Sequence, residues 1–366
     1  DLRIKLIEKK IQRLSHKING RAERRVLFET PLEPNYNVHI FYYAWYKSPP
    51  VDRKFKYWNN ERKIINSTKI VKNSLPTLTN YYPQLGFYSS RNASIIEQHM
   101  QQLRKIGAGV VLVAWYPPEI DDSPDDNLSL LMDIAAKYNI KIALHIKSYS
   151  NRNPASLFKH IKKFIDTFQY HRALFRLSSN NHLLPVYYIY YPQDTDSTSW
   201  KELLSVEGNL SIRKTKYDGI FIGLLANLEQ RSEIKRSGFD GFYTYFASNG
   251  ITYGASWKNW KSLSKYAEQN NLIFVPCISP GYFNGLPDTY TRHRLHGNYY
   301  DVGWRSAIAA NTLLVAITSF NAWKEGSQIE PAVPRTINGY RYMDYEPERP
   351  QFYLDLTGWW ISRFKK

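Results

Sequence analysis

The chain of 366 residues has little sulfur and no long apolar run. Its one cysteine, Cys277, excludes an internal disulfide and a cysteine-based zinc site within one chain. No window approaches the about 18 continuous apolar residues of a membrane-spanning helix, and the first residues, DLRIKLIEKK, have neither a signal-peptide core nor a transit-peptide composition. We expect no metal, no other cofactor and no transmembrane segment in this chain.

Acidic residues are also scarce, with 32 Asp and Glu against 49 Lys and Arg, which gives a net charge of +17. Such an excess is typical of proteins that bind nucleic acid or an anionic surface. Here it is spread along the chain, and there is no RNP motif, zinc finger or recognition helix to focus it. We therefore expect no nucleic-acid partner.

Positive charge is concentrated in the first 25 residues, which also carry an apolar stripe. The stripe follows a 3-4-3-4 spacing: Ile4, Ile7, Ile11, Leu14 and Ile18. This spacing predicts a helix that Gly20 can end. Residues 1–19 then either dock on the following domain or mediate self-association or binding to a protein partner, whereas a membrane-surface helix fits less well without Trp or Phe on the apolar face. We assign residues 1–35 to a basic amphipathic helix and linker.

Aromatic residues are abundant, with 29 Tyr, 17 Phe and 10 Trp, which indicates a folded chain. From residue 36 onward, short runs rich in Val, Ile, Tyr and Phe alternate with helix-period segments. The strand candidates are 38–46, 109–117, 141–147, 184–191, 217–226, 239–247, 272–279 and 313–321. Their almost continuous apolar character is typical of parallel strands that are covered on the outside.

Helical patterns lie between and after these runs, at 94–107, 128–139, 155–168, 256–270, 302–311 and 352–364. Eight strand-then-helix units without a linker predict a single α/β domain over residues 36–366, a (β/α)8 TIM barrel. Residues 47–93 have no strong period and are predicted to form a loop over the barrel mouth.

The predicted strand ends are aromatic at seven of the eight positions. Catalytic and binding residues of such barrels lie where strands end, at the C-terminal mouth. Aromatic side chains with few charges are the lining expected for sugar rings. Any one of these residues is explained equally well by core packing, but their joint placement favours carbohydrate.

A set of motifs accompanies this pattern. NAWKEG at 321–326 has the form N-x-W-x-E-G and is followed by SQIEPAVP at 327–334. Further blocks are FYYAWY (41–46), YYPQLGFYSSR (81–91), AWYPP (114–118), HIKSYSNR (145–152), SGFDGFYTYFASNG (237–250) and PGY (280–282). In this order the blocks resemble glycoside hydrolase family 99, the endo-α-1,2-mannosidases of the Golgi and their bacterial relatives.

The resemblance implies a (β/α)8 barrel that cleaves α-mannosides of N-glycans or mannans with retention and without a metal. Two carboxylates three residues apart, after the eighth strand, carry the chemistry in this family. The first takes the proton of the sugar 2-hydroxyl, so that O2 attacks C1 and an anhydro-sugar forms. The second protonates the leaving oxygen and then activates water.

This chain departs from the family pattern at three strand ends. Glu325 matches the second carboxylate and remains an acid/base candidate, whereas Ala322 stands where the family has the first, and a methyl group cannot accept a proton. Lys147 replaces another family Glu, and Asn227 and Leu228 stand where mammalian members carry paired Glu. If Lys147 points away from the cavity, it only solvates its loop and has no bearing on catalysis.

The resemblance and the strand ends together predict the sugar contacts Trp45, Tyr46, Trp115, Tyr116, His145, Tyr245, Tyr282, Arg294, Asn321 and Trp323. His145 is also explained as a core histidine, and Glu330 as a brace of its loop. Sequons occur at Asn66, Asn92, Asn127 and Asn209. A chain of this composition yields a few by chance, so a secretory location, Golgi lumen or extracellular, rests on the resemblance.

The leading hypothesis is a catalytically silent relative that binds a mannose glycan or serves as a structural or assembly module. The alternative is an active retaining endo-α-1,2-mannosidase, in which Ala322 was introduced artificially or another carboxylate has moved in. Candidates for such a carboxylate are Glu119, Asp121, Asp122 and Asp194.

Overall fold

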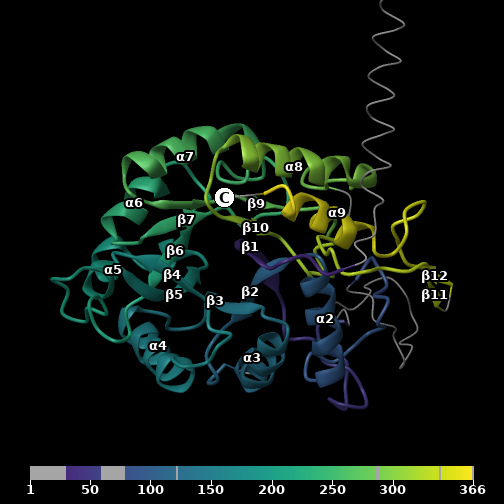
Figure 1. Cartoon of the computed structure of the whole chain (residues 1–366), viewed down its shortest axis with the longest axis horizontal. Helices are drawn as coiled ribbons and strands as arrows, with labels where there is room; N and C mark the ends of the chain where they lie inside the picture. The colour runs from purple at the N-terminus through teal and green to yellow at the C-terminus, as the bar shows by residue number, and fades with distance from the viewer. Residues whose placement is uncertain (1–29, 59–78, 121–122, 286–287, 338, 365–366) are drawn as a thin grey trace, which may run out of the picture.

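A computed structural model describes residues 30–58, 79–120, 123–285, 288–337 and 339–364 (Figure 1). These residues form a parallel barrel in which each strand leads into a helix on the outside. The prediction of a (β/α)8 barrel is confirmed. The helix predicted for the first 19 residues lies outside the described residues.

The barrel follows the strand order β8-β7-β6-β5-β3-β2-β1-β10-β9, with every neighbouring pair parallel. The strands are β1 Asn35–Tyr42, β2 Ala108–Trp115, β3 Lys141–Ile146, β5 His182–Ile189, β6 Ile220–Leu224, β7 Gly241–Tyr243, β8 Ile273–Val275, β9 Cys277–Ile278 and β10 Val315–Ile317. Proline has no N–H to donate, so Pro276 interrupts one strand between β8 and β9. Because these two pieces end the order, they close the ring, and all eight predicted strands are found.

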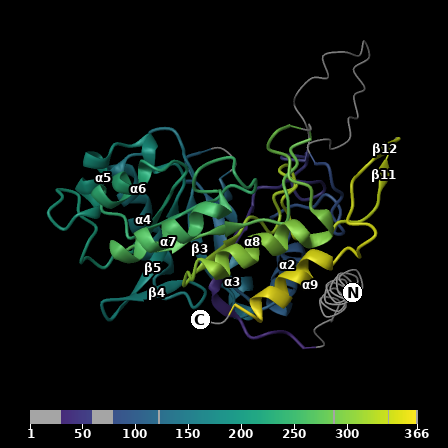
Figure 2. The ribbon, with the colours of Figure 1, turned by 90° about the horizontal axis from the view of Figure 1, so that it is seen from above.

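The helices form the outer layer of the barrel, and Figure 2 shows α7, α8 and α9 along one side of it. Their bounds are α2 Ala93–Lys105, α3 Leu128–Lys137, α4 Pro154–Phe168, α5 Ser197–Leu204, α6 Gln230–Arg236, α7 Trp260–Gln269, α8 Asn298–Ala309 and α9 Phe352–Ile361. The helical patterns did not pick out α5 and α6. These helices are short, and α6 buries one residue, Ile234, so its period is hard to detect.

The strands separate two apolar layers. In β2, Val110 and Leu112 belong to the core inside the barrel, whereas Val111 and Val113 pack in the layer towards the helices. Successive side chains of a strand point to opposite faces, so both faces of a covered strand must be apolar. The inner core also contains Cys277, which is 2% exposed.

Two small antiparallel pairings extend the barrel and were not predicted. β4 (Arg176–Ser179) pairs with the start of β5, and β11 (Thr336–Ile337) pairs with β12 (Tyr340–Arg341). Their polar sequences give no apolar alternation from which to infer a strand.

The ends of the described chain meet at the N-terminal side of the barrel, where Asn35 Nδ2 donates a 2.7 Å hydrogen bond to the carbonyl oxygen of Phe364. No described helix is long and apolar enough to cross a membrane. The mouth lies at the opposite side, where the strands end.

Candidate functional site

Glu325 lies in the loop after β10 and enters the barrel mouth half-buried. Burial raises the pKa of its carboxyl, and the charges of Lys147 and Lys324 lower it. The loop is tied to its neighbour, since Phe283 N donates to the Glu325 carbonyl oxygen at 2.9 Å. Gly326 has φ +58°, and a Cβ there would lie 2.8 Å from the Phe283 oxygen, so the close approach requires glycine.

The charge of Glu325 acts on five of the described tyrosines. Burial raises the pKa of each, and the charge of Glu325 raises it further. They are Tyr43, Tyr46, Tyr190, Tyr245 and Tyr282. The phenols therefore stay protonated and can donate hydrogen bonds.

Lys147 follows β3 and lies over the rings of Tyr190 and Tyr245, which form the aromatic wall of the mouth. Its Nζ is 3.5 Å from the ring centroid of Tyr190 and 5.1 Å from that of Tyr245. Burial lowers the pKa of the amine to about 8, while Glu325 raises this pKa and Arg152 lowers it. The side chain thus packs on these rings rather than extending into bulk solvent.

Two hydrogen bonds position the aromatic wall from below. Tyr43 and Tyr245 join their hydroxyls at 2.5 Å, and His145 Nε2 lies 2.8 Å from the Tyr243 hydroxyl. His145 is fully buried, and burial together with Lys147 and Arg152 lowers its pKa well below the ordinary value. Its imidazole is therefore neutral and has the contacts of a core histidine.

Ala322 occupies the other end of the local motif and is 5% exposed. Its backbone N–H donates to Ser319 Oγ at 2.8 Å, while its methyl group packs with the core. The charged groups that shift the Glu325 pKa are lysines rather than a carboxylate. Of the two motif positions, 322 and 325, only Glu325 carries a side chain that can transfer a proton.

Three predicted sugar contacts lie in a layer below the mouth. Asn321 and Trp323 are fully buried, and Tyr46 is 3% exposed. The Asn321 amide accepts from Tyr43 N at 2.8 Å and donates to the Tyr43 carbonyl at 3.0 Å, and the Tyr46 hydroxyl donates to the Asn321 carbonyl at 2.7 Å. These contacts position the loop, and a direct contact of the three residues with sugar stays a prediction.

Glu330 holds the underside of this loop and has the bracing contacts that the sequence suggested. Its buried carboxylate accepts from Tyr88 Oη at 2.8 Å and Trp323 Nε1 at 2.9 Å, and lies 3.1 Å from His99 Nε2. Tyr88 and His99 were not identified from the sequence, because they lie more than 200 positions away from Glu330 along the chain.

Aromatic side chains follow β1 and β2. Trp45 stacks on Tyr57 at 5.2 Å, and the Tyr57 hydroxyl lies 3.3 Å from that of Tyr116. Trp115 is buried and donates to Asp125 at 2.8 Å. The described part of the predicted mouth loop therefore contributes Tyr57, which sequence reasoning missed.

Arg294 lies behind the Glu325 loop. It is 9% exposed and donates to the carbonyl oxygens of Gly326 at 2.9 Å and Gln328 at 2.8 Å. Its guanidinium packs against the rings of Tyr81, Tyr345 and Tyr353. These contacts position the loop that carries Glu325, and a contact of Arg294 with sugar stays a prediction.

Other acidic candidates lie at the rim or on the outside. Glu119 pairs with His160 at 3.5 Å, and its side chain is 57% exposed. Asp194 accepts from Ser148 Oγ at 2.7 Å and lies 3.6 Å from Arg152. Residues 121 and 122 lie outside the described residues. Neither described acid is among the charges that act on Glu325.

The loop after β6 carries no acidic residue at positions 227 and 228. Asn227 is exposed, and Leu228 is partly buried. The backbone N–H groups of Ala226 and Asn227 both donate to Gln230 Oε1, at 2.7 and 2.9 Å.

The sequons differ in access. Asn209 is exposed, and Asn92 is half-buried at the start of α2. Asn127 is 4% exposed, and its amide donates to the Ser90 carbonyl, so this side chain has no room for a glycan. Asn66 lies outside the described residues.

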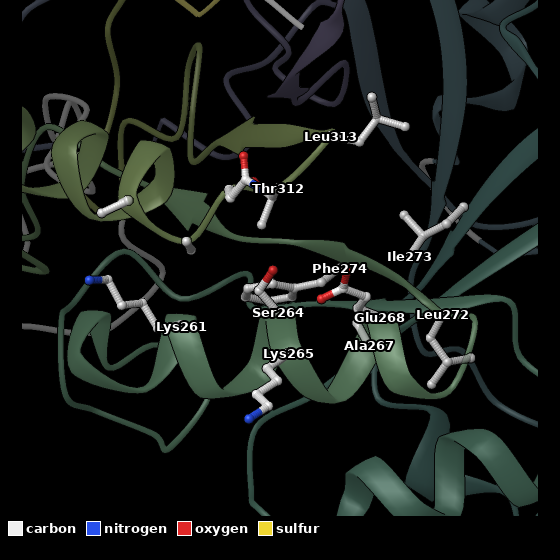
Figure 3. A pocket seen from close by; sticks show the side chains of 13 residues that line it. Lys261, Ser264, Lys265, Ala267, Glu268, Leu272, Ile273, Phe274, Thr312 and Leu313 are labelled. Atoms are coloured by element: carbon white, nitrogen blue, oxygen red, sulfur yellow. The ribbon is translucent and has the colours of Figure 1, made fainter.

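A separate hollow of about 570 Å³ lies between α7 and the segment before β10, at the N-terminal ends of the strands. Figure 3 shows Ser264, Lys265 and Glu268 on α7, with Thr312 and Leu313 opposite. It is remote from Glu325. Within the described parts of the chain, no three His, Cys, Asp or Glu side chains lie close enough together to hold a metal ion.

Comparisons with known proteins agree with this geometry. Residues 33–366 match the model of glycosyl hydrolase family 99. The chain is 42% identical to a glycoprotein endo-alpha-1,2-mannosidase of Mus musculus, over 91% of this chain and 76% of that protein. It is 41% identical to a glycoprotein endo-alpha-1,2-mannosidase of Xenopus laevis, over 91% of this chain and 78% of that protein. The structure of the GH99 endo-alpha-mannosidase from Bacteroides thetaiotaomicron superposes with a TM-score of 0.83 at 35% identity, covering 90% of this chain and 98% of the other.

Proposed function

Since the chain belongs to glycosyl hydrolase family 99, we propose that it binds α-mannosides in the barrel mouth but has lost the hydrolytic step. The observation that carries the proposal is Ala322, whose methyl group packs in the core three residues before Glu325. A base that is lost from a glycosidase costs roughly 10²- to 10⁴-fold in rate. Glu325 alone cannot serve both proton-transfer roles of the family's retaining route.

The aromatic wall supports retained binding. Trp45, Tyr190 and Tyr282 are partly exposed rings on which the C–H groups of a pyranose can stack, and the protonated phenols can donate to sugar hydroxyls. Such contacts do not need the missing carboxylate. We therefore expect affinity to survive the loss of turnover.

The second candidate function is an active endo-α-1,2-mannosidase, and one observation favours it. Glu325 is half-buried and its pKa is raised, as suits a general acid. The relatives that carry this activity in their names are about 40% identical to the chain.

Two measurements on the full chain separate these candidates. The first follows release of a disaccharide from glucosylated and plain α-1,2-mannosyl oligosaccharides, with Glu325→Gln as the matched control. Release that disappears in the control would establish the enzyme. The second is calorimetry with α-1,2- and α-1,3-linked mannose oligosaccharides at millimolar concentration. Heat without release is the expected result, and absence of both would leave an architectural module.

We further propose a secretory location, in the Golgi lumen or outside the cell, on the basis of the relatives. Residues 1–19 would bind a protein partner or pack on the barrel, because soluble monomers seldom leave an apolar stripe uncovered. Sedimentation of the full chain and of a chain starting at residue 26 tests the proposed role of residues 1–19. Identical monomers of equal stability would contradict it.

A further inference from the structure

The ammonium group of Lys147 forms no ion pair within 4.0 Å among the described residues. Glu325 is the carboxylate whose charge acts on it. The faces of Tyr190 and Tyr245, at 3.5 and 5.1 Å, are its close neighbours. A ring face replaces only part of the hydration that a cation loses on burial.

The other charges nearby leave Lys147 available. Arg152 has both terminal nitrogens bonded at 2.5 Å to the carbonyl oxygens of Tyr190 and Tyr191, and it lies 3.6 Å from Asp194. Arg152 is therefore occupied by the protein itself. The charge of Glu325 acts on Lys147, but no ion pair joins these two described residues.

We propose that the mouth takes a mannoside bearing an anionic group, with Lys147 Nζ as the contact for a phosphate, carboxylate or sulfate oxygen. This inference rests on the proposed function, because it assumes that the mouth binds mannosides. The sugar ring packs beside the ammonium on the partly exposed rings of Trp45 and Tyr282, while its anionic oxygen displaces solvent from the ammonium. Lysine suits this role as a compact point charge with three donors.

The state of the surrounding groups sets the pH range of this contact. The titratable and charged groups that face Lys147 are Glu325, Tyr190, Tyr245, His145 and Arg152. The two phenols keep their protons because their pKa values are raised, and the imidazole stays neutral. With the pKa of Lys147 at about 8, the preference for anions falls as pH rises above that value.

The test is calorimetry on the full chain with four probes: methyl α-mannoside, mannose 6-phosphate, methyl α-mannuronoside and inorganic phosphate. We expect at least one anionic sugar to bind about tenfold more tightly than the neutral sugar at low salt. Lys147→Gln brings the two affinities within about twofold, since the charge is gone, whereas Lys147→Arg keeps the preference. Lys265→Gln is the matched control, because it removes an exposed charge from α7 on the outside of the barrel.

Each other result overturns a definite part of the proposal. Equal affinity for neutral and anionic sugars overturns this inference and leaves the proposed function standing. No binding of any mannoside overturns both. A preference that survives Lys147→Gln removes Lys147 from the contact, and inorganic phosphate binding as tightly as the phosphorylated sugar overturns the mannoside part. The phosphate and carboxylate arms identify which anion the site takes.

Discussion

Trp323 Nε1 donates a hydrogen bond to Glu330 Oε2 at 2.9 Å, and both side chains are fully buried. The two residues flank Glu325 in the loop after β10, so their contact closes the loop beneath the mouth. Because Tyr88 and His99 bond to the same carboxylate, the direction in which Glu325 projects depends on residues that are distant in sequence.

The first prediction concerns this brace. Glu330→Gln should lower the free energy of unfolding by about 2–4 kcal/mol, because the amide cannot accept all the bonds that the carboxylate accepts and a buried donor loses its partner. Chemical denaturation measures this loss. Glu268→Gln on the exposed face of α7 is the control and should change stability by less than about 0.5 kcal/mol. A loss of similar size in both variants would contradict the role of Glu330.

The second prediction concerns the missing base. Ala322→Glu alone should recover little disaccharide release, because Lys147 also faces Glu325, and an ammonium near the new carboxylate would weaken it as a base. The double change Ala322→Glu with Lys147→Glu should exceed the single change by roughly tenfold or more. Ala322→Gln has the size of Glu without its basicity and should stay inactive. Full recovery by the single change would refute this expectation.

The third prediction concerns pH. The pKa of Lys147 falls from 10.5 to about 8 on folding, so between these values the unfolded chain binds more protons than the folded one. The stability of the native chain, compared with Lys147→Gln, should therefore rise as pH increases from about 8 to 10.5 and stay level below that range. Urea denaturation of both proteins across this range gives the difference. A difference that does not change with pH would show that the amine titrates normally.

The fourth prediction concerns the sequons. In a eukaryotic secretory host, Asn209 and Asn92 should carry glycans, because Asn209 is exposed and Asn92 caps α2 through its oxygen, leaving the amide nitrogen free for attachment. Asn127 should stay unmodified, since its amide is buried against Ser90. Mass spectrometry of peptides after enzymatic deglycosylation distinguishes the sites. Modification of Asn127 would show that this segment opens before it packs.

The barrel was predictable because its strands are apolar on both faces. The apolar run at 109–117 predicts a strand that is covered on both faces. In the structure β2 is buried on both faces. By contrast, α6 packs through one apolar residue, Ile234, and the β4–β5 extension is polar, so neither leaves a periodic signal.

The strand ends that form the site were predictable from the sequence, but the burial of each side chain was not. Trp45 and Tyr282 are partly exposed at the mouth, whereas Asn321 and Trp323, which belong to one motif, turn downward to bond with Tyr43 and Glu330. Which motif residues face the cavity depends on partners from other strands. Those partners, such as Tyr88 and His99, have no spacing relative to the motif that a single sequence reveals.

Cys277 lies inside the barrel on β9, and the chain has no other thiol. Burial raises the pKa of this thiol to about 12, so the folded chain should scarcely react with a thiol-specific reagent. A reagent molecule can reach the sulfur only when the strands separate. When labelling is faster than closing, its rate equals the rate at which the barrel opens, so Cys277 reports this event without an engineered thiol.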